Sequence, residues 1–169
     1  MFALTLFLLC AFCDEKILDA QTVYRGEHAS VLVTYQPAAQ GHLLIIPNRH
    51  VPMYHELSPE EIAEMGSLVQ RTQAVIERLY GAREYLLLQK NGALSGQTVP
   101  HVHIHFLPRH EATWTATFIT SVLTAWFWPP LSPEKLEAYR QEVSRAFLES
   151  DAPQTAQSPL PVFAAALSE

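Results

Sequence analysis

Three histidines stand at alternate positions in one short stretch of the chain, His101, His103 and His105, with Val102 and Ile104 between them. On a β-strand, residues two apart share a face, so we expect the three imidazoles on one side and the apolar residues in the core. Packing does not explain three imidazoles, since a core takes apolar side chains and a solvent face usually takes threonine, lysine or glutamate. The spacing therefore indicates chemistry, and a cluster of incidental surface histidines is the less favoured interpretation.

Two kinds of chemistry fit such a strand. A neutral imidazole is nucleophilic near pH 7, so one histidine could attack phosphorus while its neighbours share protons and bind phosphoryl oxygens. Alternatively, the histidines could chelate a catalytic transition metal, as alternating histidines do in many oxygenases and some hydrolases. The metal interpretation calls for a nearby carboxylate, and residues 91–110 contain none.

The residues just before the histidines favour phosphate. They include Gly92, Gly96, Gln97 and Thr98. Glycines allow backbone N–H groups to approach an anion, and an amide or a hydroxyl can donate to phosphate oxygens. No Gly-Lys-Ser or Gly-Lys-Thr follows, so the loop is not a P-loop. The sequence therefore predicts a histidine nucleophile that acts on a phosphate bond.

Strands and one long helix are predicted to hold this loop in place. Four segments have strand-like patterns, the first of them a hairpin: 22–35, 42–46, 83–89 and 99–107. A helix is predicted from Ser58 to Gly81, because Ser58 and Glu61 form a capping box and Gly81 suits a helix end. Strands joined by tight turns around one long helix predict an α+β fold on a mostly antiparallel sheet.

The apolar spacing of the long helix predicts which of its residues face the core. These are Ile62, Met65, Val69, Ile76 and Leu79. A second helix is predicted from Ser132-Pro133 to about Ser150, and its apolar face carries Leu136, Tyr139, Val143 and Phe147. We expect a catalytic domain over 1–110, a helical extension packed on it over 111–150, and a flexible tail over 151–169.

Composition excludes several classes of protein. The 169 residues are 49% apolar and 17% charged, which is typical of a globular chain rather than a disordered or membrane-spanning one. The net charge of −6 argues against a protein that binds a nucleic-acid polymer, although an acidic protein can still hold a small anion with a few placed groups. The apolar segment 1–12 lacks the basic residues and the cleavage site of a signal peptide and is too short to cross a bilayer. We therefore expect a cytoplasmic protein with no membrane partner.

The only two cysteines, Cys10 and Cys13, have the Cys-x-x-Cys spacing. Two thiols do not make a secreted disulfide framework, and this spacing more often indicates metal or redox chemistry. A metal pair, a redox pair and two buried free thiols all stay open at this point.

The run from Gly96 to Arg109, Gly-Gln-Thr-Val-Pro-His-Val-His-Ile-His-Phe-Leu-Pro-Arg, resembles the signature of the histidine triad (HIT) superfamily. The run from Gly41 to His50 is similar to the second strand and turn of the same family. The likeness covers about residues 10–109. It implies a homodimer with a five-stranded, mostly antiparallel sheet, one long helix between strands, and here a C-terminal helical extension. It also implies hydrolysis or transfer of nucleoside monophosphates, with a purine nucleotide as the expected substrate.

Matched residue by residue, the resemblance gives His103 as the nucleophile that forms a covalent nucleotidyl-histidine. His105 would contact the phosphate and the scissile bond, and Gly96, Gln97 and Thr98 would bind phosphoryl oxygens. Water would then release the nucleotide, and no organic cofactor is expected. The rival hypotheses are a nucleotide-binding regulatory protein with little turnover and, less favoured, a metalloenzyme built on the histidine strand.

Two positions depart from the family pattern. Lys90 stands thirteen residues before His103, where the family usually has asparagine or glutamine, so either Lys90 supplies a charge or Asn91 takes the role. Thr34 stands where an acidic or amide residue usually grips the ribose hydroxyls. A hydroxyl binds a diol less firmly than a carboxylate does, so we expect relaxed ribose selectivity.

One branch of the family carries a similar Cys-x-x-Cys near its start and binds zinc with it. The resemblance implies a structural zinc held by Cys10, Cys13, His50 and His101, a closed tetrahedral donor set. The remaining histidines, His28, His42, His55 and His110, are expected at the surface or in structural roles. The aromatic group Trp114, Trp126, Phe127 and Trp128 is expected to pack in a core or an interface.

Overall fold

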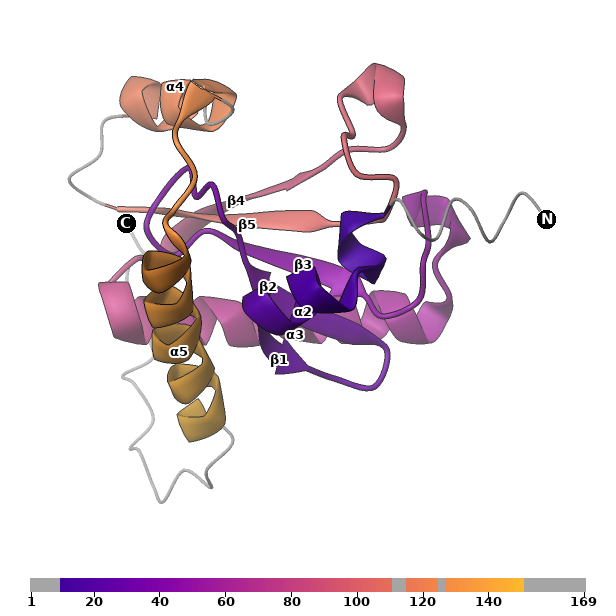
Figure 1. The fold of residues 1–169 in the computed structure, drawn as a ribbon, viewed down its shortest axis with the longest axis horizontal. Coiled ribbons are helices and arrows are strands. Elements are labelled where there is room, and N and C mark those ends of the chain that lie inside the picture. Colours follow the sequence, from indigo (N-terminus) through magenta and orange to yellow (C-terminus); the bar gives the residue numbers. More distant parts are fainter. Residues whose placement is uncertain (1–9, 111–114, 125–126, 151–169) are drawn as a thin grey trace, which may run out of the picture.

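A computed structural model describes residues 10–110, 115–124 and 127–150 (Figure 1). The expected tail over 151–169, together with Trp114 and Trp126, lies outside the described residues. Within them, no helix has the length and apolar character needed to cross a membrane.

Five antiparallel strands form one sheet (Figure 1). They are β1 (Thr22–Arg25), β2 (Ala29–Val33), β3 (Leu43–Pro47), β4 (Glu84–Gln89) and β5 (Ile104–Arg109). Their order is β1-β2-β3-β5-β4, so β5 is inserted between β3 and β4. The α+β fold with a five-stranded antiparallel sheet is confirmed, and the insertion places β5, which carries His105, inside the sheet rather than at its edge.

The long helix α3 (Pro59–Tyr80) connects β3 to β4. The Ser58 hydroxyl accepts from the backbone N–H of Glu61, whose carboxylate accepts from the Ser58 N–H, and Gly81 ends the helix with a φ of 71°. Met65 and Ile76 face the core as predicted. Ile62 is 41% exposed, because the buried stripe instead continues through other positions. These are Leu68, Thr72 and Val75.

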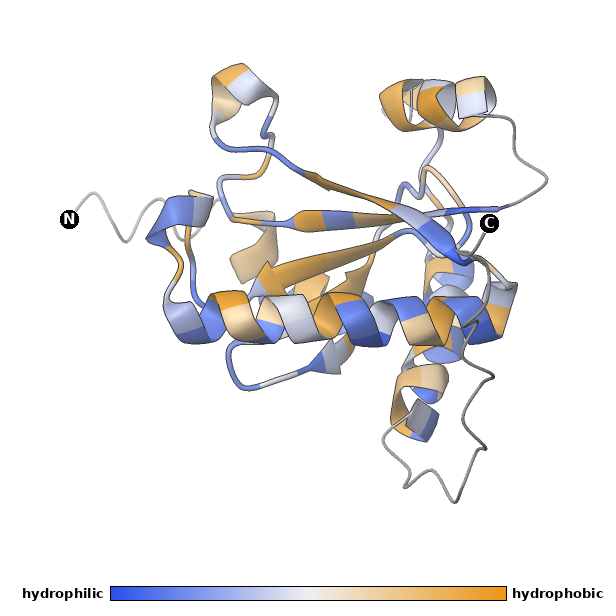
Figure 2. Ribbon diagram, turned by 180° about the vertical axis from the view of Figure 1, so that it is seen from behind, coloured by the Kyte–Doolittle hydropathy of each residue, from blue (hydrophilic) through white to orange (hydrophobic). Residues whose placement is uncertain are grey.

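The main core lies on the face of the sheet that α3 covers (Figure 2). The predicted second helix is α5 (Pro133–Ser150), which packs against α3, β1 and the short helix α2 (Glu15–Gln21). Val143 and Phe147 of α5 are fully buried, and Leu136 and Tyr139 pack against the same core. The predicted apolar face of this helix is confirmed.

The opposite face of the sheet carries two smaller apolar clusters. One joins the N-terminal segment to β2 and β3 through Phe12, Leu32 and Leu44. The other joins β4 and β5 to α4 (Thr115–Thr124), a helix that the sequence pattern did not predict. Neither cluster closes over the whole face, which leaves room between them for a cavity.

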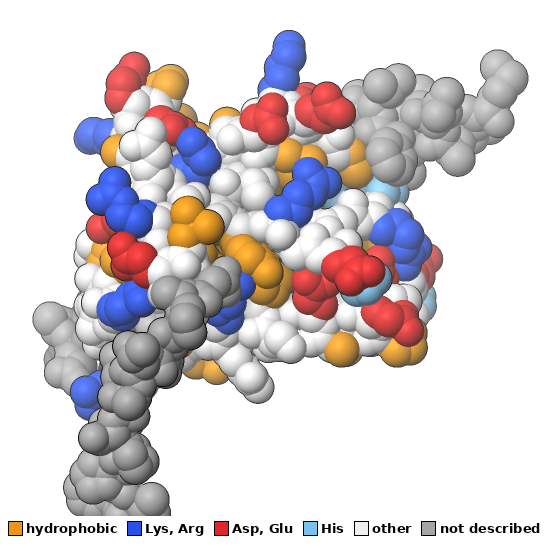
Figure 3. All heavy atoms as spheres, turned by 90° about the horizontal axis from the view of Figure 1, so that it is seen from below, with side chains coloured by type: hydrophobic (Ala, Val, Ile, Leu, Met, Phe, Trp, Pro, Cys, Tyr) orange, Lys and Arg blue, Asp and Glu red, His pale blue; other side chains and the backbone are white. Residues whose placement is uncertain are grey.

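Acidic and basic side chains are interspersed over the face seen from below in Figure 3. This mixture accords with a chain of modest net negative charge. An anionic ligand on this face would therefore be held by locally placed groups rather than by a surface of one sign.

The predicted strand over 99–107 is wrong in its first half, because β5 begins only at Ile104. Its ladder partners end there, with Ile104 opposite Gln89 of β4 and Ile45 of β3. Pro100 has no N–H to donate, and the N–H of Val102 bonds the carbonyl of Val51, outside the sheet. His101 and His103 therefore lie on irregular chain, and only His105 is in the strand.

Candidate active site and metal cluster

His103 is buried, with 5% of its surface exposed, and its ring is fixed by one hydrogen bond. Its Nδ1 lies 2.7 Å from the backbone carbonyl oxygen of His101. A carbonyl only accepts, so Nδ1 carries the hydrogen of the neutral ring and Nε2 carries the lone pair. Burial is the main cause that lowers the pKa of His103, and the charge of Lys90 lowers it further. The neutral, nucleophilic form is therefore favoured.

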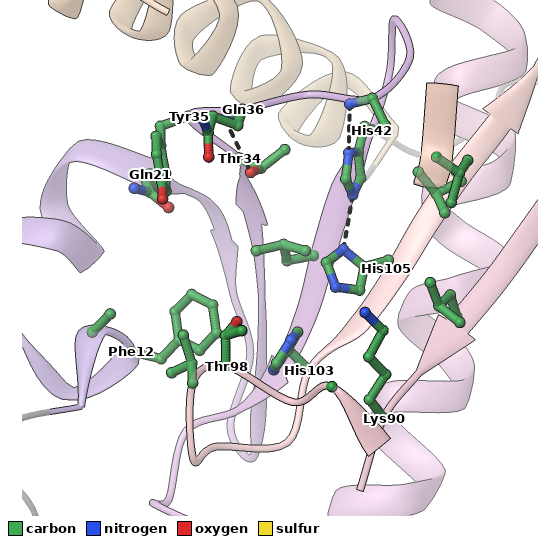
Figure 4. A pocket seen from close by; sticks show the side chains of 18 of the residues that line it. Phe12, Gln21, Thr34, Tyr35, Gln36, His42, Lys90, Thr98, His103 and His105 are labelled. Carbon is green, nitrogen blue, oxygen red and sulfur yellow. Dashed lines mark hydrogen bonds between the residues drawn. The ribbon is translucent and has the colours of Figure 1, made fainter. Parts of the chain in front are cut away.

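His105 and His42 form a hydrogen-bonded pair whose direction follows from the backbone. The N–H of Ala38 donates to Nδ1 of His42 at 3.0 Å, so the hydrogen of the neutral His42 ring is on Nε2. That Nε2 lies 3.0 Å from Nδ1 of His105 and donates to it. The hydrogen of His105 is therefore on its own Nε2, which faces the cavity (Figure 4).

Burial keeps both rings of this pair neutral. It lowers the pKa of His42 to about 3. Burial, with the charges of His42, His103 and Lys90, lowers the pKa of His105 to about 3 as well. At neutral pH the chain Ala38–His42–His105 thus presents a fixed N–H donor close to His103, whose ring centroid is 5.0 Å from that of His105.

A cavity of about 410 Å³ opens in front of these rings, large enough for a small-molecule ligand (Figure 4). Its walls are mostly apolar, and among the described residues no aspartate or glutamate lines it. The side chains around it that carry a polar or charged group are Gln21, Thr34, Tyr35, Gln36, His42, Lys90, Thr98, His103 and His105. A ligand with a negatively charged group and an apolar body fits this lining.

The structure distinguishes Lys90 from Asn91, the two candidates for the role that the family resemblance gives to an amide residue. Lys90 lines the cavity and points toward His105 (Figure 4). Asn91 lies outside the lining: its Oδ1 accepts from the N–H of Tyr54 at 2.8 Å, and its amide also exchanges hydrogen bonds with Gln89. Of the two, only Lys90 is placed to act on a bound ligand.

Hydrogen bonds of the Gln97 side chain hold the glycine-bearing loop in place. Gln97 accepts from the N–H of Gly92 through Oε1 and donates through Nε2 to the carbonyl of Pro52 at 2.9 Å. Its side chain is thereby turned away from the cavity, whereas Gly96 and Thr98 line it. Thr34 also lines the cavity, and its hydroxyl accepts from the N–H of Gln36.

Cys10, Cys13, His50 and His101 form a second cluster, in which one donor atom of each lies within 4.8 Å of all the others. Nδ1 of His101 is 3.5 Å from Sγ of Cys10 and 3.6 Å from Sγ of Cys13, and Nδ1 of His50 is 3.3 Å from Sγ of Cys13. In a tetrahedral zinc site, sulfur and nitrogen ligands lie about 3.5 Å apart. The donor set and its spacing fit a four-coordinate metal ion.

The protonation of the cluster also suits a metal. Nε2 of His101 donates to the carbonyl of Pro47 at 2.9 Å, which leaves the lone pair of Nδ1 facing the two thiols. Burial, with the hydrogen bond and charge of Cys10, raises the pKa of the Cys13 thiol to about 12. A bound cation would favour the thiolate form of Cys13, because a cysteine ligates a metal ion only after losing its proton.

The family is settled by comparison with known proteins. The model of the HIT domain matches residues 15–112, more than half of the chain. The chain belongs to the HIT family. The matched region holds the whole sheet and α3, whereas α4 and α5 follow it.

Relatives with named activities support this assignment. The chain is 33% identical to an adenosine 5′-monophosphoramidase of Schizosaccharomyces pombe, over 80% of this chain and 96% of that protein. It is 37% identical to the asymmetrical bis(5′-nucleosyl)-tetraphosphatase of the same yeast, over 56% of this chain, and it spans about half of that relative's length. A zinc-bound histidine triad protein from Mycobacterium smegmatis has the same fold, with a TM-score of 0.65 at 23% identity over 86% of this chain and 97% of that one.

His42 is the member of the site that the sequence pattern did not single out. It was expected among the surface or structural histidines, yet it is buried, lines the cavity and contacts His105. The available signal was its place directly before β3, the strand that pairs with β5. In that register Leu44 lies opposite His105, and His42, two residues before Leu44, projects from the same face beside His105.

Proposed function

We propose that this protein is a nucleotide hydrolase or nucleotidyl transferase that breaks a phosphoramidate or phosphoanhydride bond through His103. The observation that carries the proposal is the hydrogen bond from Nδ1 of His103 to the His101 carbonyl, which leaves the Nε2 lone pair free inside the cavity. A positioned neutral imidazole of lowered pKa is a nucleophile at neutral pH.

The reaction would run in two displacements at phosphorus. Nε2 of His103 forms a bond to phosphorus while the bond to the leaving nitrogen or oxygen breaks with its electron pair. An amine takes a proton from solvent, and a phosphate leaves as an oxyanion. Water then attacks the phosphorus of the nucleotidyl-histidine and releases its proton to solvent. The P–N bond breaks with its electron pair returning to Nε2, and neutral His103 is regenerated.

The cavity residues take defined roles in this proposal. The N–H of His105 and the ammonium of Lys90 stabilise charge on the phosphoryl oxygens and the leaving atom. Thr98 and the backbone at Gly96 bind phosphoryl oxygens, and Thr34 contacts the ribose. Gln97 acts as a positioning residue that holds the loop, since both ends of its amide are bonded to backbone.

Two relatives support this reaction class, because their names describe hydrolysis of an adenosine phosphoramidate and of a dinucleoside polyphosphate. The test is turnover of an adenosine phosphoramidate and of diadenosine polyphosphates by wild type and His103→Ala. We expect a loss of at least a thousandfold in the variant, with the exposed His55→Ala as the control. Equal rates for His103→Ala and wild type would show that the proposed chemistry is wrong.

A nucleotide-binding regulatory protein is the second candidate, favoured by the departures at Thr34 and Lys90. It predicts that wild type binds the nucleotide but releases no product above the rate of His103→Ala. The same assay, combined with a binding measurement, separates the two functions.

We also propose that Cys10, Cys13, His50 and His101 hold a structural zinc ion, supported by their spacing and by the zinc in the mycobacterial neighbour. Four protein ligands leave no open position, so the ion would fix the N-terminal segment to His101 rather than take part in the reaction. Elemental analysis should find about one zinc per chain. Less than half an equivalent in wild type, or no loss in Cys10→Ser, would contradict the site.

A homodimer is proposed from the resemblance and from the exposed edge of the sheet. β4 is the last strand in the order, and its Tyr85 and Leu87 are exposed. An unpaired edge with apolar side chains suits pairing with a second copy. Sedimentation measurements should give twice the monomer mass, and the monomer mass at micromolar concentration would contradict the proposal.

A further inference from the structure

Helix α4 follows the residues matched by the HIT domain model, and yet it forms part of the cavity wall. Phe118 is buried against Ala38 and Leu107, which anchors the helix to the sheet face beside β4 and β5. One turn later, Val122 packs on the same cluster and lines the cavity. A part of this chain outside the family's common region therefore shapes the site.

The cavity has two different ends, with His103 between them (Figure 4). The first end holds Phe12, Thr34 and Thr98 and belongs to the apolar cluster of the N-terminal segment. The second end lies beyond His105 and Lys90. It is walled by apolar side chains of the α4 cluster, namely Ala38, Leu88, Leu107 and Val122.

In the proposed reaction, the leaving group and the nucleoside occupy different ends of the cavity. A nucleophile that attacks phosphorus in line expels the group on the opposite side, and the leaving atom must meet the groups that stabilise its charge. Those groups, the N–H of His105 and the ammonium of Lys90, stand at the second end. The nucleoside then occupies the first end, where Thr34 can reach its hydroxyls.

We infer that the second end is a leaving-group subsite that selects an apolar leaving group without a positive charge, and that Val122 is its specificity-determining residue. This inference rests on the proposed function and names the substrate class of that same site. The four apolar side chains favour binding of an alkyl or aryl group. Lys90 disfavours a leaving group that carries its own positive charge. Each methylene that enters the subsite is expected to raise kcat/KM about fourfold.

The first experiment measures kcat/KM of the wild-type protein for adenosine phosphoramidates of methylamine, propylamine, hexylamine and aminopropylamine. We expect the value to rise from methyl to propyl to hexyl and to fall for aminopropyl, whose second amine is a cation at neutral pH. Equal values across the alkyl series, or a preference for the aminopropyl compound, would overturn the inference.

The second experiment uses a matched pair of variants on α4. Val122→Asp places a charge in the subsite and should lower kcat/KM for the hexyl compound at least tenfold more than for the methyl compound. Leu123→Asp puts the same charge on the adjacent side chain, which is 71% exposed, and should change neither value. If both variants affect both compounds equally, Val122 does not determine specificity.

A third variant guards against simple loss of folding. Val122→Phe fills the subsite without introducing a charge, so it should lower the ratio of kcat/KM for the hexyl compound to kcat/KM for the methyl compound to about one. Any turnover of the methyl compound above that of His103→Ala shows that the variant is folded and keeps its nucleophile, and a ratio equal to that of wild type would overturn the inference. Failure of the proposed function is recognised differently, since no phosphoramidate would then be turned over by any form of the protein.

Discussion

At the scale of single residues, the protonation of the site is decided by backbone groups. The Ala38 N–H and the His101 carbonyl each fix which nitrogen of a neutral imidazole bears hydrogen. As a result His103 offers a lone pair and His105 offers an N–H, although the two side chains are chemically identical. Burial maintains this division, because it lowers the pKa of both rings.

Replacing His42 tests this division directly. His42→Leu removes the donor to Nδ1 of His105, so His105 loses its fixed tautomer and kcat should fall about tenfold, the worth of one hydrogen bond. His42→Gln keeps an acceptor for Ala38 and a donor for His105 and should restore most of the rate. The measurement is kcat and KM of both variants with an adenosine phosphoramidate. Equal losses in the two variants would mean that His42 only fills space.

Lys90 and Asn91 make opposite predictions at neighbouring positions. Lys90→Met removes the charge beside His105 and should lower kcat/KM about a hundredfold, as loss of one placed donor does. Asn91→Ala breaks contacts that lie outside the cavity, so its kcat/KM should stay within a few fold of wild type. Steady-state kinetics at matched ionic strength decide between them. A larger loss in Asn91→Ala would return the role to the amide.

At the scale of elements, the helices and strands could mostly be predicted from local sequence patterns, whereas the conformation of the glycine-bearing loop could not. The capping box of Ser58 and Glu61 and the hairpin of β1 and β2 each depend on residues close together in sequence and were predictable. The start of β5 at Ile104 depends on where β3 and β4 stop pairing. The side chain of Gln97 turns away from the cavity because it donates to the carbonyl of Pro52, a residue distant in sequence. Such contacts leave no periodic signal.

The metal cluster shows the opposite case. Cys10 and Cys13 are three residues apart, but His50 and His101 lie far from them and from each other in sequence, and periodicity does not place them together. The resemblance to the family named these four residues, and the structure brings one donor atom of each within 4.8 Å of the others. By contrast, α4 escaped prediction because it follows the recognised region, and its residues are rich in threonine rather than charged in the usual helical pattern.

Gly96 links the loop conformation to the site. It has a φ of 80°, and a Cβ at this position would lie 3.6 Å from Nζ of Lys90. Gly96→Ala should therefore lower the free energy of unfolding by about 1 kcal/mol and reduce kcat/KM several fold. Gly66→Ala is the matched control, because the helical Gly66 has open space around it and should gain about 0.5–1 kcal/mol with unchanged kinetics. Thermal unfolding and kinetics of both variants check the pair. Unchanged stability and kinetics of Gly96→Ala would contradict a requirement for glycine at this positive φ.

At the scale of the whole molecule, the site is formed by segments that are held in the fold by separate contacts. The N-terminal segment reaches it through Phe12, which contacts the rings of both His101 and His103 edge-on. β3 and β5 bring His42 and His105 together, and α4 closes the far wall. Holding these parts together requires that histidines stay uncharged inside the fold, and this requirement couples the site to global stability.

The coupling has a definite sign. His42 and His105 have folded pKa values of about 3, whereas an unfolded histidine has a pKa of about 6.5. Between these values the unfolded chain binds protons that the folded chain does not, so the free energy of unfolding should be greatest above about pH 6.5 and fall as the pH is lowered toward 3. Each histidine contributes a slope of up to about 1.4 kcal/mol per pH unit.

His42→Gln isolates one of these contributions. The variant removes a single buried titrating ring, so its free energy of unfolding should depend less steeply on pH than that of wild type, by up to about 1.4 kcal/mol per unit between pH 6 and 4. Urea unfolding of both proteins across this range, at constant zinc and ionic strength, gives the two slopes. Parallel slopes would show that His42 takes up a proton in the folded protein as readily as in the unfolded chain. The neutral chain from Ala38 to His105 would then be wrong over this range of pH.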